Sequence, residues 1–247
     1  TLMFMLLGCL SLYAADNDLI TRQITITLEK AGTLPDRIAS SKKNKITNLK
    51  IIGEINGTDL RMIREMAGSN SNGNSTDGKL SVLDLSEAKI VKGGDCYLNN
   101  GYDYTSNDVI GSRAFLGCSG LTSLTLPADI TSIGDEAFQG CSGLTSIYVY
   151  AEKVPKIDSN AFKGVDAKKC TVYVPMGTRD DYCASDFGDY FENIVEFEAT
   201  GIDKTTTSTD VEEVVRYSVN GQRLSAPTKG LNIVKYSYGS VKKVAVR

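Results

Sequence analysis

AFLGCSGLTS, residues 114–123, recurs 23 positions later as AFQGCSGLTS, residues 137–146, with nine of the ten residues identical. A third and weaker copy, IDSNAFKG, follows at residues 157–164. Self-similarity at a fixed period indicates a repeat architecture, in which each unit buries its apolar face only by stacking on its neighbours. The sequence therefore predicts coils that share one continuous core.

The repeated unit contains the apolar template LxxLxL, which at this period is typical of leucine-rich repeats. The template predicts one strand per coil, with alternate side chains facing the core. The same template recurs upstream from Leu80 and a looser version begins at Ile46, while in the third copy Lys169 occupies the first apolar place. The predicted core of the clear repeats consists of Phe115, Cys118, Leu121, Leu124, Leu126, Phe138, Cys141, Leu144, Ile147, Val149 and Phe162.

Cys118 and Cys141 occupy equivalent places in successive copies, so we expect them to lie about 4.8 Å apart, the spacing of paired strands. Buried unpaired thiols are the expectation, and a disulfide between coils is the alternative. The chain has no CxxC pair and no histidine, which excludes mixed zinc sites and Cys–His nucleophiles. GxSxG, P-loop and dinucleotide motifs are also absent, so we expect no enzymatic activity, no metal and no cofactor.

The string IGSRAFLGCSGLTSLTLPADITSIGDEAFQGCSGLTSI, residues 110–147, closely resembles the repeat of BspA-like leucine-rich repeat surface proteins of host-associated Gram-negative bacteria. KKCTVYVPMGTRDDY, residues 168–182, is similar to the closing repeat of that family. The resemblance implies an exported binding protein, either secreted or at the cell surface and outer membrane. Some family members are adhesins for host matrix proteins. The resemblance implies no catalytic residues and names no ligand.

The expected fold is α+β and mostly β. It comprises a leucine-rich-repeat solenoid of about five coils, an N-terminal cap with short helices, and a small C-terminal β-sheet domain. The expected boundaries are a signal peptide at 1–15, the N-terminal cap and first coil at 16–79, the solenoid at 80–198, a linker at 199–210 and the β tail domain at 211–247. The tail resembles the short sorting tails of type IX secretion, and a related non-sorting tail is the alternative.

Residues 1–15, TLMFMLLGCLSLYAA, are uncharged, mostly apolar and too few to span a bilayer as a helix, which predicts a secretory signal. Cleavage near Ala15 and lipidation at Cys9 are both open, because LLGC is similar to a lipobox. We therefore expect export, with membrane association only through the signal or a lipid anchor.

The net charge of −3 argues against a nucleic-acid partner, which requires a basic surface. The leading functional hypothesis is adhesion to host proteins or other cells through the repeat sheet, with a protein ligand expected and a glycan as the alternative. The segment from Val214 to the end holds seven basic residues and no acidic one, which indicates a solubilising face or a docking site. The alternative function is therefore a non-catalytic structural or assembly module whose tail directs surface sorting or docking.

The residue between the second and third apolar positions of each template points away from the core, and across five strands these residues form a candidate binding surface. They are Lys50, Asp84, Thr125, Tyr148 and Tyr173. The two adjacent tyrosines are a candidate anchor, because Tyr combines a large contact area with a low ordering cost. A cross-strand Tyr pair that only stabilises the sheet is the alternative.

Leu80 and Leu121 are 41 residues apart rather than 23, so an insertion interrupts the repeats. It contains DCYLNNGYDYTSND, residues 95–108, whose Tyr, Asn, Ser and Gly content is typical of binding loops. The candidate contact residues of this loop are Tyr97, Tyr102 and Tyr104. An insertion that packs on its own coil is the alternative.

Overall fold

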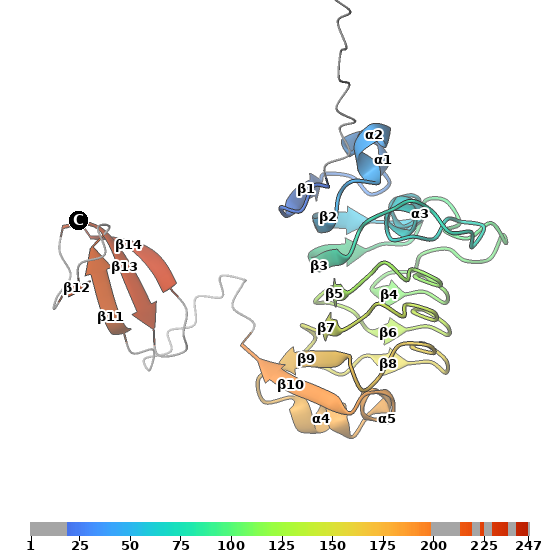
Figure 1. Ribbon diagram of the computed structural model, residues 1–247. Helices are drawn as coiled ribbons and strands as arrows, with labels where there is room; N and C mark the ends of the chain where they lie inside the picture. The colour runs from blue at the N-terminus through green and yellow to red at the C-terminus, as the bar shows by residue number, and fades with distance from the viewer. Residues whose placement is uncertain (1–18, 199–212, 219–222, 225–228, 237–240, 247) are drawn as a thin grey trace, which may run out of the picture. The chain divides into compact units, whose positions relative to one another are not determined.

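The computed structural model describes residues 19–198, 213–218, 223–224, 229–236 and 241–246 (Figure 1). The chain forms two compact units, Thr1–Thr200 and Gly201–Arg247. The expected signal peptide at 1–15, with Cys9 and Ala15, and the expected linker at 199–210 lie outside the described residues.

The first unit is a mixed α/β structure built on two parallel sheets. Within residues 19–198 the longer sheet has seven strands in chain order: β1 (Ile24–Leu28), β2 (Asn48–Ile55), β3 (Val82–Ile90), β5 (Ser123–Thr125), β7 (Ser146–Tyr148), β9 (Thr171–Pro175) and β10 (Asn193–Phe197). The shorter sheet of the same range has three: β4 (Val109–Ile110), β6 (Ser132–Ile133) and β8 (Lys156–Ile157). Figure 1 shows the strands of both sheets stacked in the same order, on opposite sides of the unit.

The sequence repeat is visible as stacked, equivalent side chains. The Phe115 and Phe138 rings stack with centroids 5.2 Å apart, and Phe138 stacks on Phe162 at the same separation. All the predicted core residues of the clear repeats are buried between the two sheets. Since each coil covers the apolar edge of the preceding one, the repeats share one continuous core.

A ladder of hydroxyl groups joins successive coils where the strands of the longer sheet begin. Thr122 Oγ1 donates to Ser81 O at 3.1 Å, and Thr145 Oγ1 donates to Thr122 O at 3.1 Å. Ser81 Oγ in turn donates to Thr47 O at 3.1 Å. Each hydroxyl therefore bonds the coil before it, which favours one register of stacking over a shifted one.

The residue before each Ala-Phe pair has a left-handed backbone conformation. Its φ is 60° at Arg113, 56° at Glu136 and 59° at Asn160. Asparagine tolerates this region better than long side chains do, so the first two positions carry backbone strain. The turn lets the Arg113 N–H donate to Asp135 O of the next coil at 2.9 Å.

Two details of the sheet differ from the expectation drawn from the template. The sheet is longer than five coil strands, because the alternating segments that form β1 and β10 pair in register with β2 and β9. In the third copy Cys170, not Lys169, fills the core position. Lys169 leaves 77% of its side chain exposed and pairs with Asp166 at 2.9 Å, because an unpaired ammonium group is costly to bury.

Short helices lie at both ends of this unit. The N-terminal ones are α1 (Leu34–Arg37), α2 (Ser40–Lys43) and α3 (Gly57–Met66), and the C-terminal ones are α4 (Arg179–Cys183) and α5 (Asp186–Tyr190). Asn56 caps α3, and the carboxylate of buried Asp59 completes this cap and also accepts the N–H groups of Gly32 and Leu34. This carboxylate therefore holds the segment before α1 against α3.

The second unit is a four-stranded antiparallel sheet over its described residues. Its strand order is β12 (Arg223–Leu224), β11 (Glu213–Ser218), β13 (Gly230–Tyr236) and β14 (Val241–Val246).

Candidate functional site

The predicted outward residues form one row across the longer sheet. Lys50, Asp84, Thr125, Tyr148 and Tyr173 pair in register from β2 through β3, β5 and β7 to β9. Their neighbours along each strand are buried, whereas these five residues are partly exposed. The structure therefore brings all five onto the face of the sheet that lies opposite the core.

The N-terminal part of the row is charged, and its charges are paired with each other. Lys50 Nζ lies 2.6 Å from Glu87 Oε1 and 3.4 Å from Asp84 Oδ2. The hydrogen bond to Glu87 raises the pKa of Lys50, and burial opposes it with a smaller effect. Because one ammonium group is shared by two carboxylates, this end of the row is polar and keeps one net negative charge.

The C-terminal part of the row is aromatic. Tyr148 and Tyr173 stack with ring centroids 4.5 Å apart and planes 9° apart. Phe197, at the end of β10, presents its ring edge-on to Tyr148 at 5.7 Å and to Tyr150 at 5.0 Å. We call these four rings, Tyr148, Tyr150, Tyr173 and Phe197, the aromatic patch.

Tyr150 and Phe197 were not among the predicted site residues. The alternation of side chains along a strand could have predicted Tyr150, since it lies two residues after Tyr148 and therefore on the same face of the sheet. Burial, with a smaller contribution from Asp84, raises the pKa of Tyr150.

Short polar side chains run beside the tyrosine rings. Ser123, Ser146 and Thr171 pair in register on β5, β7 and β9, two positions before the outward row. Because side chains alternate along a strand, these three residues lie on the same face of the sheet as the tyrosines. In addition, the Tyr148, Tyr150 and Tyr173 hydroxyls make no hydrogen bond within the described residues.

The inserted loop, residues 95–108, divides its tyrosines between the core and the surface. Tyr97 is only 1% exposed, and its hydroxyl donates to Ser112 O at 2.8 Å. The prediction that Tyr97 is a contact residue is therefore wrong, because its ring packs into the core. The same burial raises the pKa of Tyr97. Tyr102 and Tyr104 are 85% and 51% exposed and stay available at the surface.

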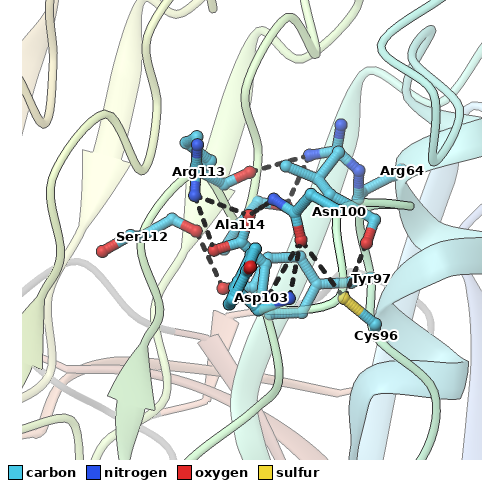
Figure 2. Close-up of polar contacts among 10 residues, drawn as sticks. Arg64, Cys96, Tyr97, Asn100, Asp103, Ser112, Arg113 and Ala114 are labelled. Atoms are coloured by element: carbon cyan, nitrogen blue, oxygen red, sulfur yellow. Dashed lines mark hydrogen bonds and ion pairs between the residues drawn. The ribbon is translucent and has the colours of Figure 1, made fainter.

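A polar network fixes this loop to the first clear repeat (Figure 2). The carboxylate of Asp103, whose side chain is 7% exposed, pairs with Arg113 Nη2 at 3.0 Å and accepts a hydrogen bond from Asn100 Nδ2. Asn100 Oδ1 accepts the N–H groups of Tyr102 and Asp103. The loop is therefore anchored on both sides of Tyr102.

Arg64, near the end of α3, lies beside this network and is fully buried (Figure 2). Its guanidinium donates to main-chain oxygens of Arg113 at 3.0 Å, Ala114 at 2.8 Å and Leu116 at 3.2 Å. Nη2 also donates to Ser69 Oγ at 3.3 Å. Burial lowers the pKa of Arg64, and the carbonyl dipoles compensate part of this cost. Arg64 therefore joins α3 to the first clear repeat.

The cysteine residues within the described ranges are free thiols. Cys118 and Cys141 are both buried, and Cys141 Sγ donates to Phe115 O at 3.1 Å. Burial raises the pKa of Cys118 to about 12 and also raises that of Cys141, so neither is a reactive thiolate. The same ranges contain no group of three or more His, Cys, Asp or Glu residues arranged to hold a metal ion.

Among the residues that the structure describes, no helical segment combines the length and the apolar character that a membrane crossing requires.

Comparison with protein families identifies the repeats. Residues 108–205 match the model of the BspA type leucine rich repeat region, with 6 copies. Regions of this type are generally non-catalytic and are generally associated with surface binding proteins. No curated protein matches the chain. The matched range includes the aromatic patch and begins after most of the inserted loop.

Proposed function

We propose that the protein is an exported, non-catalytic binding protein, secreted or at the cell surface, which adheres to host proteins or other cells. Its repeats form a leucine-rich-repeat solenoid, and the aromatic patch on the longer sheet is the contact surface for a protein ligand. The match to a BspA type repeat region supports the class of protein. The geometry of the aromatic patch supports the place at which it binds.

The observation that carries the proposal is the set of partly exposed rings whose tyrosine hydroxyls make no hydrogen bond to any residue that the structure describes. Tyr148 and Tyr173 are held by stacking, and Phe197 supports Tyr148 and Tyr150 from the edge. A ligand therefore meets rings that are already ordered, which reduces the entropy cost of binding. Aromatic residues of this kind are enriched among the residues that dominate protein interfaces.

The charged end of the row has a supporting role in this proposal. Lys50 is occupied by Asp84 and Glu87, so this part of the surface forms a polar margin beside the rings. Exposed ion pairs at an interface margin contribute to orientation and association rate more than to affinity. Substitution of Lys50 is therefore expected to weaken binding much less than substitution of the tyrosines.

The experiment is a binding screen of the purified chain, residues 16–247, against an array of matrix and cell-surface proteins. The double variant Tyr148→Ala plus Tyr173→Ala is compared with Thr125→Ala, which changes the same row without removing a ring. We expect a saturable interaction that the double variant loses and Thr125→Ala keeps. Binding that survives in the double variant would move the contact away from the aromatic patch.

The C-terminal sheet favours a second candidate function. It forms a compact unit separate from the repeats, as expected for an address or docking module. Deletion of residues 211–247 tests this function: loss of surface display with unchanged ligand binding would assign sorting or docking to the tail.

A further inference from the structure

One face of the aromatic patch is directed toward the N-terminal half of the longer sheet. β7 lies between β5 and β9 (Figure 1), and Tyr173 on β9 covers one face of the Tyr148 ring. The two ring planes differ by only 9°, so the other face of Tyr148 is directed toward β5, where Thr125 is the residue in register. Among the described residues, neither another ring nor a cation stacks on that face.

The next residue of the row beyond Thr125 is an acid. Asp84 on β3 pairs in register with Thr125, so Asp84 and Tyr148 lie two strand spacings apart, about 9.6 Å between their backbones. The side chains of the row project from the same face of the sheet. A carboxylate and a ring face therefore stand on either side of the shorter Thr125 side chain. We call Asp84, Thr125 and Tyr148 the outward triplet.

The outward triplet lies in a region of net negative charge. The ammonium group of Lys50 is shared by the carboxylates of Asp84 and Glu87, so these three groups keep one net negative charge. Glu54 and Lys89 pair in register further along β2 and β3, and their charges cancel. β5, β7 and β9 contain no charged residue. A cation over the outward triplet therefore meets an attractive field from β3 and no opposing charge from the three strands that follow.

This combination of groups matches the chemistry of a basic side chain. The face of a tyrosine ring attracts a cation placed within about 6 Å of its centre. A carboxylate forms charge-assisted hydrogen bonds with ammonium and guanidinium groups. A guanidinium is planar, so it can stack on the ring while its N–H groups donate to the carboxylate. An anionic group in the same place would be repelled by Asp84 and Glu87.

The C-terminal end of the row is apolar. Val195 on β10 pairs in register with Tyr173, and 46% of it is exposed. From Thr125 to Val195 the row crosses three strand spacings, about 14 Å, which about four residues of extended chain can span. A ligand segment that lies across the strands therefore meets an anionic end and an apolar end of the same surface.

We propose that the protein ligand of the aromatic patch carries a basic side chain that binds over Thr125, between the ring of Tyr148 and the carboxylate of Asp84. An apolar residue about four positions away in the same extended segment contacts Val195. This inference rests on the function proposed above, because it names the ligand chemistry of the same surface. Since the contact is partly ionic, binding weakens as the salt concentration rises.

The test uses acetylated five-residue peptides that have arginine at one end, leucine at the other and three serines between them, in both orders. Matched peptides replace arginine with citrulline, which has nearly the same shape and no charge. Binding to the full chain is followed through the NMR signals of the tyrosine rings. We expect an arginine peptide to bind at least about fivefold more tightly than its citrulline counterpart. Raising the salt concentration should reduce this difference.

Three variants locate the groups responsible, with the fold of each verified by circular dichroism. Asp84→Asn keeps the Oδ1 acceptor for the Ser86 N–H but removes the negative charge. It should lower the affinity for the arginine peptide about threefold or more and leave that for the citrulline peptide unchanged. Glu192→Gln removes an exposed carboxylate just before β10, at the opposite end of the sheet, and should change neither affinity. Tyr148→Leu removes the ring face and should reduce the preference for arginine.

The outcomes separate this inference from the proposed function. Equal binding of arginine and citrulline peptides, equal effects of Asp84→Asn and Glu192→Gln, or no peptide binding at millimolar concentration would each overturn it. A protein ligand that Tyr148→Ala plus Tyr173→Ala loses, but that Asp84→Asn binds as the parent does, would keep the proposed function and overturn the basic contact. Arginine-dependent peptide binding without any protein ligand in the screen would support the basic contact and count against adhesion.

Discussion

Tyr148 and Tyr173 lie opposite each other on β7 and β9, and their rings stack with 4.5 Å between centroids. Parallel, in-register strands lie about 4.8 Å apart, so equivalent side chains of successive coils are brought within stacking distance. The same pairing that extends the sheet therefore orders the two rings. Stabilisation of the sheet and ligand binding are two consequences of this arrangement, and they can be measured separately.

The stacked pair should show a coupling energy in a double-mutant cycle. Tyr148→Ala and Tyr173→Ala are each expected to lower the free energy of unfolding, with an interaction of about 1 kcal/mol between them. Urea unfolding of the parent, both single variants and the double variant gives this quantity. Strictly additive losses would show that stacking does not order the rings.

Removal of the buried guanidinium of Arg64 should be strongly destabilising. Arg64→Met removes the guanidinium donors to the main-chain oxygens of Arg113, Ala114 and Leu116, and we expect a loss of about 3 kcal/mol in the free energy of unfolding. Lys43→Met is the matched control, because it removes the partly exposed pair with Glu65 and should cost less than about 1 kcal/mol. Similar losses in the two variants would contradict the role of Arg64 in joining α3 to the first clear repeat.

Backbone strain at the repeated left-handed turn can be relieved. Glu136 has a φ of 56°, which glycine adopts without steric cost, so Glu136→Gly should raise the free energy of unfolding by about 1 kcal/mol. Asn160→Gly, at the equivalent turn, should gain less because asparagine already tolerates this region. Thermal unfolding of both variants measures the difference, and an equal or reversed order would argue against strain at Glu136.

Stability should fall at alkaline pH because of the buried thiols. Burial raises the pKa of Cys118 and Cys170 to about 12, whereas an exposed thiol titrates near pH 9. Above about pH 9 the unfolded chain releases these protons and the folded chain keeps them, so stability present below this pH is lost as pH rises. Each thiol contributes a slope of about 1.4 kcal/mol per pH unit.

Urea unfolding between pH 8 and pH 10 checks this dependence. Cys118→Ala should reduce the slope by the share of one thiol. A slope that is the same in Cys118→Ala and the parent would contradict the titration of Cys118.

The repeats were predictable because the same local pattern occurs in each coil. Phe115, Phe138 and their equivalents recur at a fixed spacing, so one periodic signal predicts both burial and stacking. The outward row follows from the same template, since side chains alternate along a strand. The template predicted burial less reliably in the degraded third copy. It placed Lys169 at a core position, whereas the structure buries the next residue, Cys170.

The environment of the inserted loop was not predictable from composition. Tyr97, Tyr102 and Tyr104 belong to the same polar segment, yet long-range partners decide which ring is buried. Tyr97 is buried in the core, where Ser112 O, from a separate segment of the chain, accepts a hydrogen bond from its hydroxyl. In the sequence, Arg64 likewise resembles an ordinary surface residue of an amphipathic helix. In the structure its guanidinium donates to Ala114 O in the turn of the first clear repeat, and the side chain is buried. Such contacts depend on the packing of separate segments, which no local pattern encodes.

The most direct test of the central claim is a titration of a protein ligand from the binding screen with three forms of the chain: the parent, Thr125→Ala, and Tyr148→Ala plus Tyr173→Ala. The account predicts similar dissociation constants for the first two and a loss of at least about tenfold in the double variant, with folding of all three shown by circular dichroism. Equal affinities in all three forms would contradict the assignment of binding to the aromatic patch.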